Sequence, residues 1–158
     1  MTTVNQVVND QSVDSIVIQT FPGSDLPSLA EDFTGEVEAG TAGSHGVQLT
    51  TVLNVVAGES FLSSIKGRGA RALIERVEFA NVVLVTGTNE LEPEKARKVN
   101  EVLEALNPEA RIVYGDTNMP ISALQAEHPF DLDAVQRRTS WRGDGIEAEV
   151  TPPIVRFN

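Results

Sequence analysis

Four adjacent residues, Thr86, Gly87, Thr88 and Asn89, could form a ligand-binding loop. They follow an apolar, valine-rich run at 81–86 and precede a helical pattern, so the loop is expected to leave the carboxyl end of a buried strand. Loops at that end of a sheet are where α/β proteins usually bind ligands. A purely structural interpretation competes with this one, because glycine permits an unusual backbone turn and asparagine can hydrogen-bond locally.

Four apolar runs rich in β-branched residues predict the strands that would position this loop. The runs are nearly continuous rather than alternating, which is typical of strands buried on both faces of a parallel sheet. They lie at 15–20, 47–57, 81–86 and 111–116.

Helical patterns lie between these runs. The clearest begins near Pro93, places Val99 and Leu103 on its apolar face, and stops at Asn107, because Pro108 disfavours helical geometry in the residue before it. Strands that alternate with helices predict an α/β fold, a three-layer and mostly parallel sheet flanked by helices and joined by right-handed crossovers. Two further helices are predicted over 26–33 and 70–80.

The chain is expected to form one main domain, 1–138, followed by a tail, 139–158. A glycine-rich stretch at 35–46 lacks periodicity and is interpreted as a surface loop. The tail ends in an extended piece that Pro152 and Pro153 restrict to a sheet edge or a loose end.

Composition excludes several classes of function. The 158 residues carry 12 basic and 23 acidic side chains, and the formal net charge of -11 repels nucleic acid and anionic lipid. There is no cysteine, so disulfides, thiolate metal sites and thiol catalysis are excluded. The first residues do not resemble a signal peptide and the longest apolar runs are too short to span a bilayer, so a cytoplasmic protein is expected.

The order of these segments resembles that of the CobW-like GTPases, P-loop proteins of metal trafficking and cobalamin synthesis. The strongest similarity is in "ERVEFANVVLVTGTNELEPEKARKVNEVLEALNPEARIVYGD", which resembles the guanine-recognition strand, the following helix and the turn into the next strand. "VDSIVIQTFPGSDLPSLAEDF" and "VQLTTVLNVVAGESFL" are similar to two further strands of that family. The final "GIEAEVTPPIVRFN" is similar to the first strand of its C-terminal domain. The resemblance implies a P-loop-NTPase-like fold, GTP binding and a link to metal homeostasis.

The chain departs from the family pattern wherever the family performs chemistry. No G-x-x-x-x-G-K-[ST] motif is present, so the backbone nest, lysine and hydroxyl that hold phosphates and magnesium are missing. In the segment that resembles the Walker B region, represented by Gln19, Thr20 and Gly23, the glutamine replaces an acidic residue. Ala57 replaces a second carboxylate.

The loop at 86–89 occupies the place of the family's Asn-Lys-x-Asp motif. Asn89 stands where an aspartate would accept from two guanine donors, and its amide leaves a mismatched pair that costs about 1–3 kcal/mol. The loop is therefore interpreted as the remnant of a base pocket. If it has acquired a new ligand, that ligand is expected between 86–89 and 116–118, two loops at the same end of neighbouring strands.

These departures predict a non-catalytic member of this scaffold that lacks the first strand and the phosphate loop, with no catalytic residue, no metal site, no cofactor and no useful affinity for GTP. The missing strand would leave an unpaired, apolar sheet edge, so self-association or pairing with a protein partner is the leading hypothesis. The alternative is a weak GTP-binding protein or GTPase metal chaperone, completed by a partner or by a segment that precedes residue 1.

Overall fold

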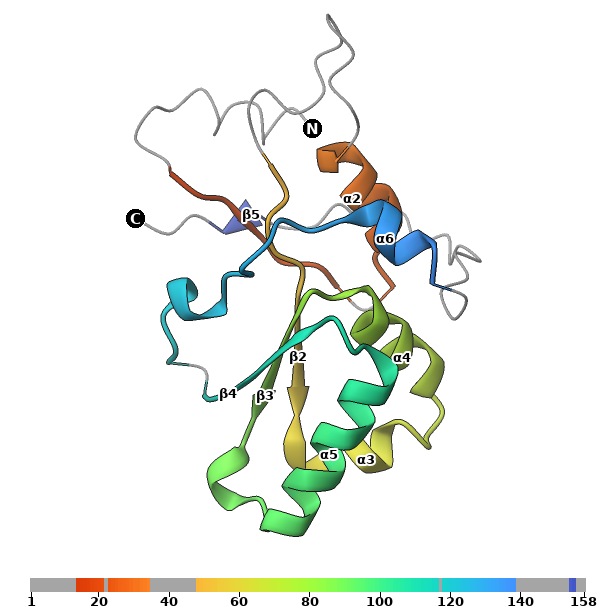
Figure 1. The fold of residues 1–158 in the computed structure, drawn as a ribbon, viewed down its shortest axis with the longest axis vertical. Coiled ribbons are helices and arrows are strands. Elements are labelled where there is room, and N and C mark those ends of the chain that lie inside the picture. Colours follow the sequence, from red (N-terminus) through yellow and green to blue (C-terminus); the bar gives the residue numbers. More distant parts are fainter. Residues whose placement is uncertain (1–13, 22, 35–47, 117, 139–153, 156–158) are drawn as a thin grey trace, which may run out of the picture. The chain divides into compact units, whose positions relative to one another are not determined.

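The computed structural model describes residues 14–21, 23–34, 48–116, 118–138 and 154–155 (Figure 1). The chain divides into two compact units, one formed by 1–49 with 142–158 and the other by 50–141. Each unit is described by itself. No helix in the described ranges is both long and apolar enough to cross a membrane.

The described residues of the first unit form a short antiparallel ribbon and one helix. Strand β1 (Val17–Ile18) pairs with β5 (Ile154–Val155), with Val17 opposite Val155. Helix α2 (Leu26–Thr34) follows β1, and its first turn is capped by Asp25, whose carboxylate accepts from the Ser28 amide at 3.1 Å.

The second unit is built on a parallel sheet with strand order β2-β3-β4. Parallel strands need a crossover: α3 and α4 join β2 to β3, and α5 joins β3 to β4. The elements of this unit are β2 (Leu53–Ala57), α3 (Gly58–Ser64), α4 (Ala70–Phe79), β3 (Val82–Thr86), the 3-10 turn η1 (Thr88–Glu90), α5 (Pro93–Leu106), β4 (Arg111–Tyr114), the 3-10 turn η2 (Ile121–Leu124) and α6 (Leu132–Gln136).

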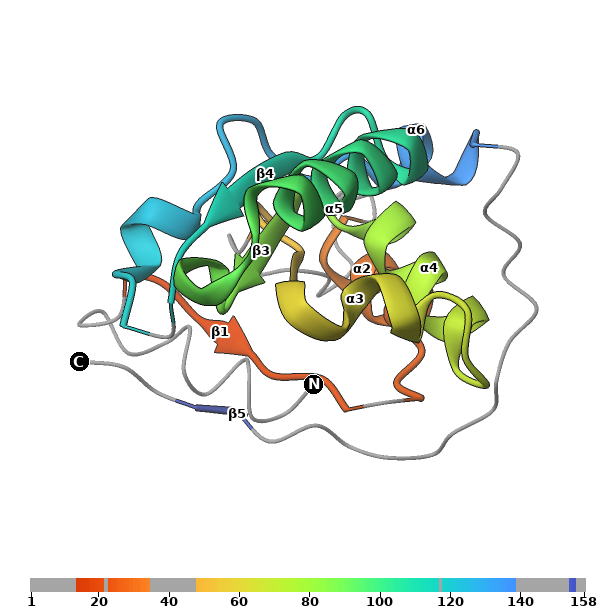
Figure 2. The same cartoon turned by 90° about the horizontal axis from the view of Figure 1, so that it is seen from below.

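The core lies between one face of this sheet and α3, α4 and α5. Alternate residues of β3, Val83 and Val85, point into it and are almost fully buried. They pack in one cluster with Phe61 of α3, Val77 of α4 and Val99 of α5. Figures 1 and 2 show these three helices gathered along one side of the strands. The α/β class and a parallel sheet flanked by helices are therefore confirmed, whereas the three-layer and P-loop-NTPase-like arrangement stays a prediction.

Two strand predictions need correction. β1 does not continue the parallel sheet within the described residues; it pairs antiparallel with β5, and Val17 is exposed. β2 is not buried on both faces, because it lies at the edge of its sheet: Leu53 and Val55 are 39% and 54% exposed. The glycine-rich stretch at 35–46 and most of the tail lie outside the described residues, and the division into 1–138 and 139–158 stays a prediction.

Candidate functional site

Three connections leave the carboxyl end of the parallel sheet in the second unit. β2 runs directly into α3 at Gly58, β3 runs into the loop at 86–89, and β4 runs into a connection that begins at Gly115. This is the end of the sheet at which the sequence predicts a ligand site. Its chemistry depends on which polar groups these connections leave unpaired.

The loop at 86–89 is tied into the protein at its start. The Thr86 hydroxyl donates to the Val56 carbonyl of the neighbouring strand at 3.3 Å. Gly87 has φ 71°, in the left-handed region that favours glycine, and turns the chain into η1. Asn89 is exposed on that turn. The local geometry therefore supports the structural interpretation, and a base-pocket role stays a prediction.

Gly58 closes the space beside this loop. A Cβ at this position would lie 3.1 Å from Val85 Cγ1, 3.2 Å from the Thr86 carbonyl oxygen and 3.3 Å from Leu91 Cδ1. These distances are tighter than most contacts between a real Cβ and its neighbours. The glycine lets the start of α3 approach the end of β3 closely, so this point of the candidate site is filled by packed protein.

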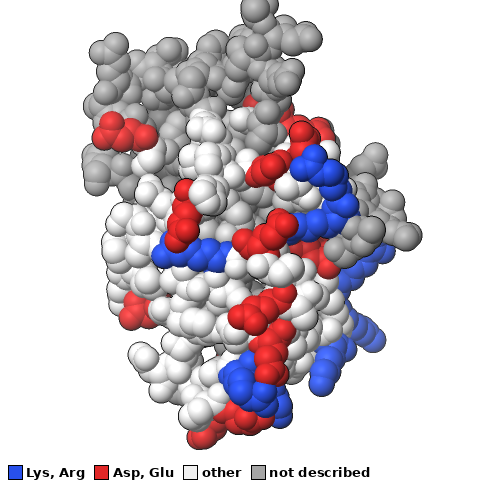
Figure 3. All heavy atoms as spheres, in the orientation of Figure 1, with Lys and Arg blue, Asp and Glu red and all other residues white. Residues whose placement is uncertain are grey.

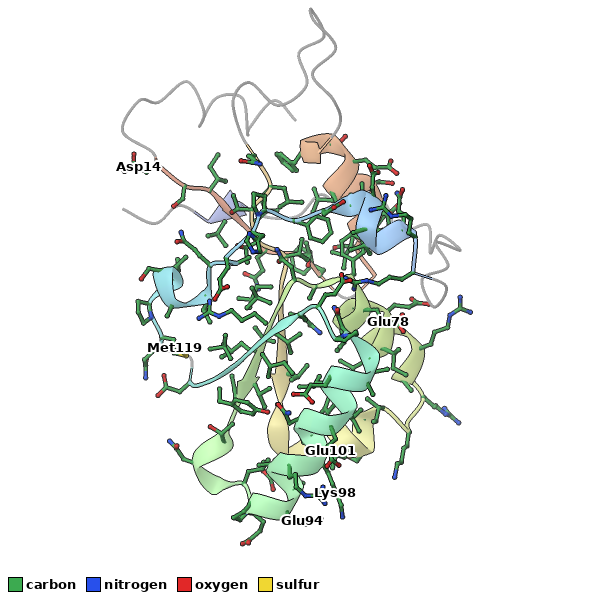
Figure 4. The ribbon with its side chains drawn as sticks, in the orientation of Figure 1. Asp14, Glu78, Glu94, Lys98, Glu101 and Met119 are labelled. Atoms are coloured by element: carbon green, nitrogen blue, oxygen red, sulfur yellow. The ribbon has the colours of Figure 1, made fainter. Side chains whose placement is uncertain are left out.

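The connection after β4 is stabilised by the side chain of Asp116. One oxygen of the Asp116 carboxylate accepts from the Asn118 amide at 2.8 Å, a local turn that aspartate favours. Met119, labelled in Figure 4, folds over Gly115 and leaves no room for a Cβ there. The carboxylate remains exposed to solvent, but one of its oxygens is engaged by the backbone.

Gln19, Thr20 and Gly23, the predicted Walker-B-like group, belong to the first unit. Gln19 is exposed, and Gly23 has φ 93° in a turn that is closed by a bond from the Ser24 amide to the Phe21 carbonyl. The loop at 86–89 belongs to the other unit. Whether the two groups form one site therefore stays a prediction.

The surface around α5 is charged and internally paired. Arg97 contacts both Glu94 and Glu101 on successive turns, and Lys98 lies 3.5 Å from Glu94. The Arg97 guanidinium lowers the pKa of Glu94. Figure 3 shows acidic and basic side chains interleaved on this face. Within the described ranges, no three histidine, aspartate or glutamate side chains form a group that could hold a metal ion.

The phenol of Tyr114, at the end of β4, is expected to titrate above its ordinary pKa. Partial burial of the phenol raises the pKa, although the residue is 42% exposed, and the Glu104 carboxylate raises it further. The hydroxyl donates to Asn100 Oδ1 at 2.6 Å, and the Asn100 amide donates to Glu104. Because the folded pKa exceeds the unfolded value of about 10, the stabilisation is complete below pH 10 and is lost as pH rises through the folded pKa.

Tyr114 is the one tyrosine of the sequence, so ultraviolet absorbance reports its ionisation directly. We expect a midpoint above that of the urea-unfolded chain, and a lower midpoint in Glu104→Gln. A folded-state midpoint equal to the unfolded one would contradict this assignment.

Asn107 has a structural role that the sequence prediction missed. Its side chain is buried and donates to the carbonyls of Val77, Glu78 and Ala80 at 2.8, 3.2 and 2.7 Å, so it caps the carboxyl end of α4, where Glu78 is labelled in Figure 4. Its oxygen accepts from Arg138 at 2.9 Å. Sequence analysis identified this residue only as the end of a helix.

Comparison with known proteins gives one distant relative. Over 157 residues the chain is 22% identical to "Zinc-regulated GTPase metalloprotein activator 1" of Dictyostelium discoideum, and the alignment covers 87% of this chain and 33% of that protein. The chain thus spans about a third of the length of this curated relative. No family model and no solved structure matches the chain. The similarity is compatible with the expected relationship to metal-trafficking GTPases.

Proposed function

We propose that the chain is a non-catalytic protein-interaction module on a scaffold related to metal-homeostasis GTPases. The observation that carries the proposal is the state of the carboxyl end of the parallel sheet. There the Thr86 hydroxyl bonds to the neighbouring strand, Gly58 packs against the end of β3, and Asp116 accepts from its own loop. These groups hydrogen-bond or pack within the protein, and this favours a structural role over nucleotide binding.

The energetics of nucleotide binding favour the same proposal. A phosphate site needs several charge-assisted hydrogen bonds worth about 1.5–3 kcal/mol each. The sequence has no glycine-rich phosphate loop with its lysine to supply them. Asn89 also mismatches guanine by one donor, at a cost of about 1–3 kcal/mol. Useful affinity for GTP is therefore not expected of this chain alone.

Titration with a fluorescent GTP analogue, in magnesium and with or without zinc, tests the proposal. We expect no saturable binding up to about 1 mM ligand, which corresponds to a binding free energy weaker than about -4 kcal/mol. The informative control is Asn89→Asp, which restores a carboxylate acceptor for guanine. It should bind no better, because the phosphate contacts are still missing. Saturable micromolar binding by the unmodified chain would overturn the proposal.

A second candidate is a weak GTP-binding protein that a partner, or a segment preceding residue 1, completes. It is favoured by the convergence of three connections at one end of the sheet and by the printed name of the distant relative. The same titration, repeated with a candidate partner that carries a lysine-containing phosphate loop, separates the two. Binding that appears only in the mixture supports this second candidate.

A further inference from the structure

Strand β2 presents a backbone edge with which no other strand of the described ranges pairs. The Val52 carbonyl accepts from the amides of Asn81 and Val82, and the Val56 carbonyl accepts from the Thr86 side-chain hydroxyl. In the parallel register of β2 with β3, the backbone groups of even-numbered β2 residues therefore point toward β3. Successive residues of a strand alternate, so the amides and carbonyls of Leu53 and Val55 point away from the sheet. No other described strand pairs with this edge.

The edge is held rigid at its start and is apolar along its length. Asn81 fixes the chain that leads into β2: its side chain accepts from the Val52 amide at 2.8 Å and donates to the Thr50 carbonyl at 3.0 Å. The side chains of Leu53 and Val55 are exposed on one face. The sequence from 50 to 58 has no charged residue, in a chain of net charge -11. Edge strands of soluble proteins are usually protected by charge, proline or cover, and this strand has neither charge nor proline.

An unsatisfied donor lies on the other face of the same strand. The Asn54 amide nitrogen Nδ2 is buried and has no hydrogen-bond partner. Asn54 points toward the helix-covered face, as Val56 does. Buried polar groups are nearly always paired, and leaving one unpaired costs about 1–3 kcal/mol. A group that brought an acceptor to this edge would remove that cost.

We propose that β2 pairs antiparallel with β2 of a second copy of the chain, around a two-fold axis at Asn54. Leu53 then lies opposite Val55 of the second copy, and Val55 lies opposite Leu53 of the second copy. Each of these two pairs is a hydrogen-bonded pair that exchanges two backbone hydrogen bonds. Asn54 lies opposite Asn54 of the second copy in a non-hydrogen-bonded pair, where side chains approach most closely. This proposal deepens the proposed function by naming the surface and the partner.

The second copy fits this edge for three reasons. An amide carries both a donor and an acceptor, so the two half-buried Asn54 side chains, once each amide turns toward the axis, can satisfy each other. The exposed Leu53 and Val55 meet each other as cross-strand apolar pairs. An uncharged strand avoids like-charge repulsion, which would otherwise oppose self-pairing of so acidic a chain. A register centred on Val55 would instead place Asn54 opposite Val56 and leave its amide unpaired.

Sedimentation velocity on the full chain at tens of micromolar tests the pairing. We expect a species of twice the 17.0 kDa monomer mass. Val55→Lys should raise the dissociation constant on the order of tenfold or more, because an edge lysine opposes strand addition. Ile121→Lys is the matched control, since Ile121 is an exposed apolar residue of η2, which follows β4 at the opposite edge of the sheet, and its change should leave the dimer intact. A monomer in the unmodified chain, or equal effects of the two lysines, would overturn the proposal.

Cysteine cross-linking tests the register, because the sequence contains no cysteine. Asn54→Cys should form an intermolecular disulfide under mild oxidation, since directly opposed Cα atoms in a non-hydrogen-bonded pair lie about 4.5 Å apart, within disulfide reach. Val55→Cys should cross-link at least several-fold more slowly, because two copies of position 55 lie diagonally. Faster cross-linking at 55 than at 54 contradicts the proposed axis. Circular dichroism confirms that each variant is folded.

These outcomes separate the inference from the proposed function on which it rests. If the chain is a monomer and binds no nucleotide, the self-pairing of β2 is disproved, and the protein-interaction proposal stands with a partner other than a second copy. If the chain forms a dimer and binds GTP, the pairing of β2 is supported and the non-catalytic proposal is overturned.

Discussion

Replacing Asn107 by leucine is expected to destabilise the protein by about 2–4 kcal/mol, a large part of the stability of a domain this size. The side chain is 1% exposed, and its amide reaches three carbonyls at the end of α4 from about thirty residues away in the sequence. Helix ends carry carbonyls with no partner inside the helix. Leucine fills a similar volume but donates nothing, so buried acceptors lose their hydrogen bonds.

Urea unfolding followed by circular dichroism measures this effect as a fall in the midpoint. Asn89→Leu is the matched control, because Asn89 is exposed on the turn η1. It should change the free energy of unfolding by no more than about 0.5 kcal/mol. Asn107→Asp should be at least as damaging as Asn107→Leu, because it turns a donor into an acceptor that faces carbonyl oxygens. Equal stability of Asn107→Leu and Asn89→Leu would disprove the capping role.

Elements whose signals are local could be predicted from the sequence. The helix predicted from Pro93 to Asn107 is α5, Pro93–Leu106, because proline at the first turn and a sustained apolar face act within the segment itself. The strand predicted at 81–86 is β3, Val82–Thr86, which is central and buried as a continuous apolar run predicts. The helix predicted over 70–80 is α4, Ala70–Phe79.

Features that depend on partners distant in the sequence could not be predicted. The run at 47–57 forms a strand only from Leu53 to Ala57, and composition does not say that this strand lies at an edge. The pairing of β1 with β5 joins residues near opposite ends of the chain, and nothing in either segment specifies the other. The role of Asn107 depends on α4 and Arg138 in the same way.

At the candidate site, too, local features could be predicted from the sequence and contacts between distant segments could not. Sequence placed Thr86 to Asn89 at the end of a buried strand, and the structure has them there, with Gly87 in the left-handed region that the turn interpretation expects. The bond from Thr86 to Val56 and the closeness of Gly58 to Val85 could not be foreseen, because both cross between strands. The unpaired amide of Asn54 had no sequence signal beyond a polar residue within an apolar strand.

Gly58→Val is expected to destabilise the protein by about 2–3 kcal/mol, because bulk is added where the packing has no space. Even a Cβ would lie 3.2 Å from the Thr86 carbonyl oxygen, a backbone atom that cannot move without shifting the end of β3. The two methyl groups of valine add to that strain. Thermal unfolding gives the cost as a fall in the melting temperature.

Gly67→Val is the control that separates crowding from the general cost of replacing glycine. Gly67 is exposed between α3 and α4, and the nearest atom to a Cβ there is the Ser64 carbonyl oxygen at the ordinary distance of 3.5 Å. A side chain there meets no packed core, so the change should stay within about 1 kcal/mol. If both valines cost the same, Gly58 is not a close-packing residue. The carboxyl end of the sheet would then have room near Thr86 that a ligand could use, and the case for a purely architectural loop would weaken with it.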